Sequence, residues 1–167
     1  VTVVGGSNLV VAASPDGILV SDKAASPRIK DLIGQFDHRP MYEERRWGWY
    51  RVLDYQKFKN GKEVLIKRIK ITAGKNLSYQ LHDHRNEVWT IIKGKGELVL
   101  NEKLFSVKPG DVIEINAGDK HAVKAAEDLE IIEVQIGTPL IEEDIVRLAM
   151  TWDDIQQQVM KSQNYLL

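Results

Sequence analysis

The chain contains no cysteine, which excludes disulfide bonds and thiolate chemistry and is consistent with a reducing cytoplasm. It has no apolar run of the roughly 18 residues that a membrane-spanning helix needs, and no signal-peptide pattern. The formal net charge is only −1 and no long run of one sign occurs, which argues against nucleic acid or a membrane as the main partner. We therefore expect a cytoplasmic protein that binds neither nucleic acid nor membrane.

A length of 167 residues corresponds to about one domain, and an apolar fraction of 43% is enough to build a core. The sequence begins with Val1 rather than methionine, which is consistent with a piece of a longer protein. Its character changes three times along the chain. We expect a segment of short strands and a helix in residues 1–34, a polar linker in 35–46, a strand-rich barrel in 47–140 and a helical tail in 141–167.

The first segment predicts strands at Val1–Val4, 8–13 and 18–20, separated by glycine and proline turns. A short helix is expected to follow, with Ser26 as its N-cap and Pro27 at its first position. This segment is too small for a core of its own, so we expect it to dock on the barrel or on a neighbouring subunit.

The region after the linker is rich in short apolar strands, with turn dipeptides such as Asn60-Gly61 and Pro109-Gly110 between them. Many short strands at this spacing predict a mainly β fold, either a sandwich or a barrel that includes the double-sheet jelly rolls. The strongest predicted strands are 64–71, 88–92, 97–100, 112–115 and 129–136.

The tail from Glu142 to about Leu166 predicts a helix, because its apolar residues recur at helical spacing and form one stripe. We expect such a stripe to pack on the barrel or on a dimer partner. The stripe consists of Ile141, Ile145, Leu148, Trp152, Ile155 and Val159.

Two imidazoles, a carboxylate and an amide occur at spacings that predict a metal site. Gln80 and His82 are two residues apart, so on a strand they point to the same face, and Glu87 and His121 follow. Such a mixed nitrogen and oxygen set suits a divalent first-row metal, with zinc or manganese expected. Two alternatives remain open: Gln80 instead bonds the backbone, or His84 pairs with His82 in a shifted register.

These residues and their flanking glycines resemble the two-part cupin motif, with Gln80 in the place of the usual first histidine. The first part is Gly74-x5-Gln80-x-His82-x4-Glu87-x6-Gly94, and the second is Gly110-x5-Asn116-x-Gly118-x2-His121. The resemblance implies a cupin double-stranded β-helix, also called a jelly-roll barrel, with the metal inside it.

Within the cupins, the chain is similar to type II phosphomannose isomerase domains, which form the C-terminal part of bifunctional mannose-1-phosphate guanylyltransferases. The resemblance covers roughly residues 40–148 and implies mannose 6-phosphate as the class of substrate, a homodimer, and a role in nucleotide-sugar and polysaccharide biosynthesis. The stretches that carry it are Arg46–Tyr50, Tyr79–Trp89, Ile132–Gln135 and Glu143–Arg147.

The resemblance also implies roles for charged residues outside the metal set. His84 or Glu133 would be the base that moves a proton between C1 and C2 of the sugar, and Arg147 would hold the 6-phosphate with its bidentate fork. Arg85 and Lys124 are further phosphate candidates. Alternatively, Arg147 forms a helix-surface ion pair with a carboxylate four residues earlier in the chain.

Residues 1–34 are similar to the end of the nucleotidyltransferase domain in these bifunctional enzymes, which implies such a domain as a partner. The matching residues are Asn8, Val10, Leu19, Val20, Asp22 and Lys30. At the other end, Leu148–Trp152 replaces the family's run that finishes in Tyr-Gly-Arg. We therefore expect weak or no isomerase activity from this chain alone. The competing hypotheses are a non-catalytic sugar-binding module and a structural dimerisation domain.

Overall fold

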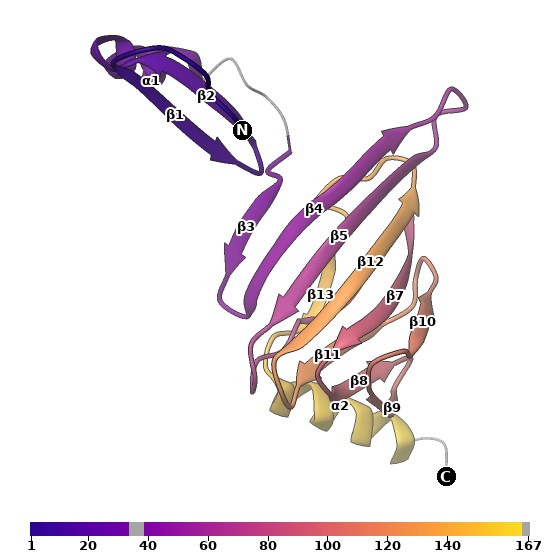
Figure 1. Cartoon of the computed structure of the whole chain (residues 1–167). Coiled ribbons are helices and arrows are strands. Elements are labelled where there is room, and N and C mark those ends of the chain that lie inside the picture. Colours follow the sequence, from indigo (N-terminus) through magenta and orange to yellow (C-terminus); the bar gives the residue numbers. More distant parts are fainter. Residues whose placement is uncertain (34–38, 165–167) are drawn as a thin grey trace. The chain divides into compact units, whose positions relative to one another are not determined.

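The computed structural model of the chain describes residues 1–33 and 39–164. These residues form two compact units, Val1–Tyr42 and Glu43–Leu167, which differ in secondary structure (Figure 1). In the described parts of the chain, no helix is both long enough and apolar enough to cross a membrane.

The first unit is a β-hairpin followed by two short helical turns. Strands β1 (Leu9–Ser14) and β2 (Gly17–Asp22) pair antiparallel, and a 3-10 helix (Lys23–Arg28) leads into α1 (Ile29–Ile33). None of the side chains described in residues 1–32 is buried, in agreement with the expectation that this segment has no core of its own.

Two local predictions for this unit were wrong. Val1–Val4 forms no strand, and the helical segment begins before Ser26. The cap is Asp22, whose carboxylate accepts a hydrogen bond from the backbone N–H of Ala24 at 2.7 Å. Because aspartate caps a helix as well as serine does, the earlier residue starts the helix and Pro27 falls inside the 3-10 turn.

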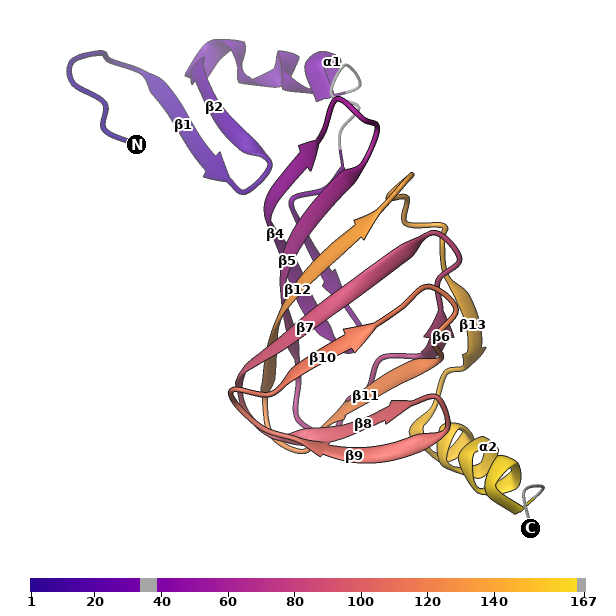
Figure 2. The ribbon, with the colours of Figure 1, turned by 90° about the vertical axis from the view of Figure 1, so that its right-hand side faces the viewer.

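The second unit consists of two antiparallel sheets that face each other, the mainly β jelly roll that the sequence predicts (Figure 2). The six-stranded sheet has the order β10 (Val112–Ile115), β7 (Arg85–Lys93), β12 (Leu129–Gly137), β5 (Glu63–Ile71), β4 (Gly48–Lys57) and β3 (Tyr42–Arg45). The five-stranded sheet has the order β13 (Val146–Ala149), β6 (Tyr79–Leu81), β11 (His121–Ala125), β8 (Gly96–Leu100) and β9 (Lys103–Val107).

The linker was expected over residues 35–46, but the last part of this range forms a strand. Residues 34–38 lie outside the described part of the chain, whereas Tyr42–Arg45 form β3 at the edge of the six-stranded sheet. The charged residues of β3 look like a linker in sequence because an edge strand is solvated on one side.

Alternation along the central strands builds both the apolar core and the site. In β5, every second residue from Glu63 to Ile71 is buried, so Leu65, Lys67 and Ile69 share one face. The neighbouring β12 repeats this pattern and buries Glu133 and Gln135 beside apolar residues. Polar groups therefore enter the interior on the same strands that supply the core.

Gly94 ends the first motif at the connection from β7 to β8, where the chain passes from one sheet to the other. Its φ is +76°, a conformation that favours glycine, and an added Cβ would lie 2.2 Å from the carbonyl oxygen of Asp128. The motif glycine is thus required by the close approach of two backbone segments.

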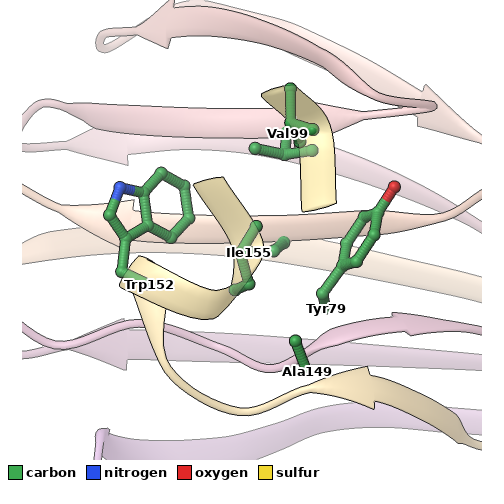
Figure 3. Close-up of a cluster of buried hydrophobic side chains, with 7 residues drawn as sticks. Tyr79, Val99, Ala149, Trp152 and Ile155 are labelled. Atoms are coloured by element: carbon green, nitrogen blue, oxygen red, sulfur yellow. The ribbon is translucent and has the colours of Figure 1, made fainter. Parts of the chain in front are cut away.

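Helix α2 (Trp152–Asn164) packs on the outward face of the five-stranded sheet. Trp152, Ile155 and Val159 enter a buried cluster with Tyr79, Val99, Ala122 and Ala149 (Figure 3). This confirms the predicted apolar stripe for its last three members and the expectation that it packs on the barrel.

The start of the helix was predicted too early. Val146–Ala149 form strand β13, which pairs with β6, and α2 begins only at Trp152. Thr151 caps the helix by accepting a hydrogen bond from the N–H of Asp154 at 3.3 Å. An open sheet edge offers the backbone of residues 146–149 hydrogen bonds that a helical periodicity in the sequence does not reveal.

Candidate metal centre

Three buried side chains with metal-binding atoms meet between the two sheets. His82 follows β6, Glu87 lies on β7 and His121 opens β11, and one ligand atom from each lies within 4.8 Å of the others. The residues come from both sheets, so formation of the barrel itself assembles the group.

Backbone carbonyl groups orient both imidazole rings. The Nδ1 atom of His82 contacts the carbonyl oxygen of Asp144, and that of His121 lies 3.0 Å from the carbonyl oxygen of Asp119. With Nδ1 donating, each Nε2 carries a lone pair and faces Glu87, at 3.2 Å for His82 and 3.8 Å for His121. The two rings are therefore held in the tautomer that a metal requires.

The Nε2 atom of His121 is buried and has no hydrogen-bond partner among the described residues. A buried polar atom without a partner costs free energy, and a cation bound at this Nε2 would remove that cost. Two imidazoles and one carboxylate are also the donor set that zinc and related metals accept. The residues present fit a divalent cation.

The protonation states of Glu87 and His121 also suit a divalent cation. Burial raises the pKa of the Glu87 carboxyl, but the adjacent His82, His121 and Arg85 outweigh it and lower the pKa to about 2. Burial lowers the pKa of His121 and so favours its neutral form. An anionic carboxylate and a neutral imidazole are the forms that bind metal.

Gln80 lies directly opposite His121 in the pairing of β6 with β11. Directly paired residues point to the same face, so Gln80 faces the interior, as its i, i+2 spacing from His82 predicts. Its amide oxygen accepts a hydrogen bond from the Ser78 hydroxyl at 2.7 Å, and its side chain lines the central cavity. Gln80 thus faces the same interior as the two imidazoles and the Glu87 carboxylate.

Arg85, which was predicted as a phosphate-binding residue, is buried beside Glu87 and His82. Its Nε donates to Glu87 at 3.0 Å, one terminal nitrogen lies 3.3 Å from His82 Nε2, and the other donates to the carbonyl oxygen of Ile141 at 3.2 Å. The guanidinium side chain is almost fully buried. The structure therefore joins Arg85 to the ligand set itself.

A second buried carboxylate lies beside the group. The indole N–H of Trp89 donates to Glu87 and to Glu133, at 3.0 Å each, and the Gln135 amide donates to Glu133 at 2.7 Å. Burial and the charge of Glu87 raise the pKa of Glu133 to about 8. Glu133 thus has a carboxyl group that exchanges protons near neutral pH.

Glu87, Trp89, Glu133 and Gln135 line a cavity of about 1090 Å³, and several arginine and lysine side chains line it as well. Arg147 lines it from β13, and the pairing of β13 with β6 places Arg147 directly opposite Gln80. Since residues 146–149 are extended, the alternative of a helical i, i+4 ion pair does not apply. The other cationic residues that line the cavity are Arg45, Arg46, Lys67, Lys75 and Arg85.

Two predicted site residues are not brought into this cavity. His84 is exposed in the loop between β6 and β7, where its backbone N–H donates to the Asp144 carboxylate at 3.2 Å. Lys124 lies three residues after His121, on the opposite face of β11, with its Nζ 5.8 Å from the ring centroid of Trp152. Only Glu133 of the two proposed bases lines the cavity.

Lys67 is one of the cavity residues that the sequence motifs did not indicate. A lysine in β5 resembles a solvated strand residue until its alternation with Leu65 and Ile69 is noticed. That alternation, which is visible in the sequence, places the ammonium group on the apolar face of the strand.

Comparison with known proteins identifies a family and a set of longer relatives. Residues 35–150 match the family model described as Mannose-6-phosphate isomerase C-terminal. The chain is 32% identical over 157 residues to a mannose-1-phosphate guanylyltransferase of Salmonella muenchen, which covers 89% of this chain and 32% of the relative. It is 32% identical over 163 residues to the xanthan biosynthesis protein XanB of Xanthomonas campestris, covering 91% of the chain and 33% of the relative.

A third relative is the alginate biosynthesis protein AlgA of Pseudomonas putida, 30% identical over 156 residues, with 88% of this chain and 31% of the relative covered. The chain therefore spans about a third of the length of the curated relatives that it matches.

Among solved structures, the fold is similar to oxalate decarboxylase from Bacillus subtilis. The TM-score is 0.54 at 15% sequence identity, and the match covers 68% of this chain and 33% of that one. At this identity the similarity supports the cupin fold alone.

Proposed function

Since the chain belongs to the Mannose-6-phosphate isomerase C-terminal family, we propose that its barrel is a metal-dependent site for mannose 6-phosphate and its ketose isomer. The observation that carries the proposal is the pair of Nε2 atoms that face the buried Glu87 carboxylate at 3.2 and 3.8 Å. The Glu87 carboxylate lines a cavity of about 1090 Å³ whose wall also has several cationic side chains, which suits a phosphorylated sugar.

The ligands of the metal would be His82, Glu87 and His121, with Gln80 as the fourth. Zinc and manganese are the ions that this donor set favours. A bound metal supplies a Lewis acid that polarises the sugar carbonyl group.

Isomerisation moves a proton between C1 and C2 of the sugar through a cis-enediol, and Glu133 is the residue we assign to this step. Its carboxylate takes the proton from one carbon, and the resulting carboxyl returns it to the other. With the pKa of Glu133 raised to about 8, first by burial and then by the charge of Glu87, the carboxylate is a stronger base than an exposed glutamate. Trp89 and Gln135 hold it in place through hydrogen bonds of 3.0 and 2.7 Å.

Arg147 is the residue we assign to the 6-phosphate. It is exposed on β13, lines the cavity and is paired with Gln80, so phosphate binding there would lead the sugar toward the ligand set. A guanidinium group matches phosphate with two parallel hydrogen bonds.

The test is an isomerase assay with mannose 6-phosphate on the metal-free protein and on protein loaded with zinc or manganese. Metal-dependent formation of fructose 6-phosphate, or metal-dependent binding of either sugar phosphate, supports the proposal. If neither sugar phosphate binds in the presence of either metal, the proposal is wrong.

A second function is favoured by one observation, the run Leu148–Trp152 in place of a Tyr-Gly-Arg sequence. With only Arg147 from this stretch to hold phosphate, the barrel would bind a sugar phosphate without turning it over. In that case it would serve as a binding or dimerisation module beside a guanylyltransferase domain, in the cytoplasmic synthesis of nucleotide sugars for polysaccharides. Binding without turnover, measured on the same protein, distinguishes the two functions.

A further inference from the structure

Lys67 brings an ammonium group into the barrel among apolar neighbours. It lies on β5 between Leu65 and Ile69 on the buried face, and only 5% of the residue is exposed. Lysine is almost never buried to this extent without a partner, because removing its charge from water is costly.

The partners of Lys67 hold the ammonium group at the cavity wall. Its Nζ donates to a Glu142 carboxylate oxygen at 3.0 Å and lies 4.6 Å from the centroid of the Tyr50 ring. Both of these residues line the cavity, as Lys67 itself does. The charge is therefore fixed in position by an anion and by an aromatic face.

A structural role alone explains this arrangement poorly. The Glu142 side chain is 38% exposed while that of Lys67 is 6% exposed, so the pair joins a buried cation to a carboxylate that water still reaches. Ion pairs with an exposed member contribute little to stability, whereas burial of the ammonium is costly. The buried Glu133 carboxyl group also interacts electrostatically with Lys67, and the cavity that Lys67 lines leaves its ammonium group open to a further anion, supplied by a ligand.

The position of Lys67 beside Glu133, the proposed base, indicates which part of a ligand would carry that negative charge. Lys67 is the direct cross-strand partner of Glu133 in the pairing of β5 with β12. Glu133 is in turn the direct partner of Trp89 on β7, so the three residues form one row on the inner face of the sheet. The ammonium thus lies beside the group that removes the proton from the sugar.

We propose that Lys67 is a catalytic residue whose ammonium hydrogen-bonds the substrate oxygen that becomes negative as the enediolate forms. The inference rests on the proposed function. When Glu133 takes the C–H proton, the C–H electron pair becomes the C=C bond of the enediolate, and the carbonyl π pair moves to oxygen. The hydroxyl proton then moves from the oxygen on C2 to the oxygen on C1, the C=C electron pair takes the proton of the Glu133 carboxyl at C1, the carbonyl bond forms at C2, and the charge returns to Glu133. A fixed cation at that oxygen lowers the energy of the charged species more than that of the neutral sugar.

The test compares two ligands on the metal-loaded protein by calorimetry. A phosphorylated aldonohydroxamate imitates the planar, anionic enediolate, and an alditol 6-phosphate has the phosphate but no such anion. We expect Lys67→Met to weaken hydroxamate binding by about tenfold or more, as the loss of one stabilising donor should, and to leave alditol phosphate binding within about twofold. Lys67→Arg retains the charge and should keep part of the preference.

The matched control is Lys70→Met, which removes a lysine from the opposite face of the same strand, where it pairs with Asp128 and does not line the cavity. This variant should bind the hydroxamate as tightly as the wild type does. If Lys67→Met weakens both ligands equally, Lys67 has only a structural role and the inference is wrong. If Lys67→Met does not fold, Lys67→Gln must show the same selective loss, and unchanged hydroxamate binding in it overturns the inference.

Failure of the proposed function gives a different result. In that case the metal-loaded wild type binds neither ligand. Metal content should be equal in the wild type and in Lys67→Met, because no proposed metal ligand is altered. A loss of hydroxamate affinity from wild type to variant therefore reports on Lys67 and not on the metal.

Discussion

Arg147 and Gln80 are direct cross-strand partners, and His121 is paired with the other side of Gln80. The three residues form one row across β13, β6 and β11, so the exposed cation, the amide and the buried imidazole point to one face of the sheet. This row joins the mouth of the cavity to the candidate metal centre.

From this row we predict that Arg147→Ala weakens the binding of a sugar phosphate by about tenfold, the value of a charge-assisted hydrogen bond of roughly 1.5 kcal/mol. Metal content should not change, because the variant leaves all four proposed ligands intact. Titration calorimetry with mannose 6-phosphate measures the effect. Arg51→Ala is the matched control, since Arg51 is an exposed arginine on β4 that does not line the cavity. Equal weakening in both variants would remove the assignment of Arg147 to phosphate.

The ligand set predicts the metal content of a histidine variant. His82→Ala/His121→Ala should fold but lose its divalent metal, because two of the three clustered ligands are removed. Elemental analysis of the purified protein measures the metal, and circular dichroism checks the fold. His84→Ala provides the control and should keep its metal, since His84 is exposed outside the cluster. Equal metal in the wild type and the double variant contradicts the site.

The raised pKa of Glu133 predicts how stability depends on pH in the metal-free protein. Burial and the charge of Glu87 raise this pKa from 4.5 to about 8, so between these values the folded state binds the proton more tightly than the unfolded state does. The contribution of Glu133 to stability is therefore complete below about pH 4.5 and is lost as the pH rises through 8.

Glu133→Gln imitates the protonated carboxyl and should remove this loss. We expect the unfolding free energy of the wild type to fall relative to that of the variant between pH 6 and pH 8.5, measured by urea denaturation in the presence of a chelator. The same difference at both pH values would mean that Glu133 titrates normally.

The cluster beneath α2 predicts a loss of stability that leaves the site unchanged. Ile155→Ala should lower the unfolding free energy by about 2–5 kcal/mol, because it removes a fully buried side chain and leaves a cavity. Met160→Ala on the same helix should change it by less than about 0.5 kcal/mol, since this residue is 62% exposed. Denaturant melts measure both, and a similar effect of the two variants would contradict the packing of α2.

The missing Tyr-Gly-Arg sequence predicts low activity. We expect the turnover of mannose 6-phosphate by this chain alone to be far below about 10 per second, the median for enzymes, even with metal bound. A coupled assay of fructose 6-phosphate measures it. A turnover near that median, abolished by Arg147→Ala with the fold intact, would show that one arginine suffices.

Local periodicity and motif spacing predicted much of the barrel. The five strongest predicted strands correspond to β5, β7, β8, β10 and β12, and three of the four predicted metal ligands cluster. Such features depend on short-range pattern, so a sequence displays them directly. Strands β4, β9 and β11 were not among the strongest predicted strands, and β3 and β13 were predicted as linker and helix. The pairing partners that make these segments strands cannot be read from their own residues.

Side-chain direction accounts for the remaining differences in the site. Lys124 was expected near a phosphate, but it falls on the opposite face of β11 from His121 because three residues separate them. His82 and His84 are two residues apart and both follow β6, but only His82 is buried, while His84 is exposed in the loop before β7. Lys67 shows the converse case, since strict alternation on β5 carries a charged residue inside.

The five-stranded sheet uses its two faces for different purposes. Gln80 and His121 face the interior between the two sheets, while their chain neighbours Tyr79 and Ala122 lie beneath α2. Substitutions on the outward face can therefore accumulate during evolution without changing the ligands, and the ligands can be exchanged without loosening the helix. Insertion of a single residue in β6 or β11 would reverse both faces at once. Such a barrel can diverge readily by substitution, but hardly at all by insertion within these strands.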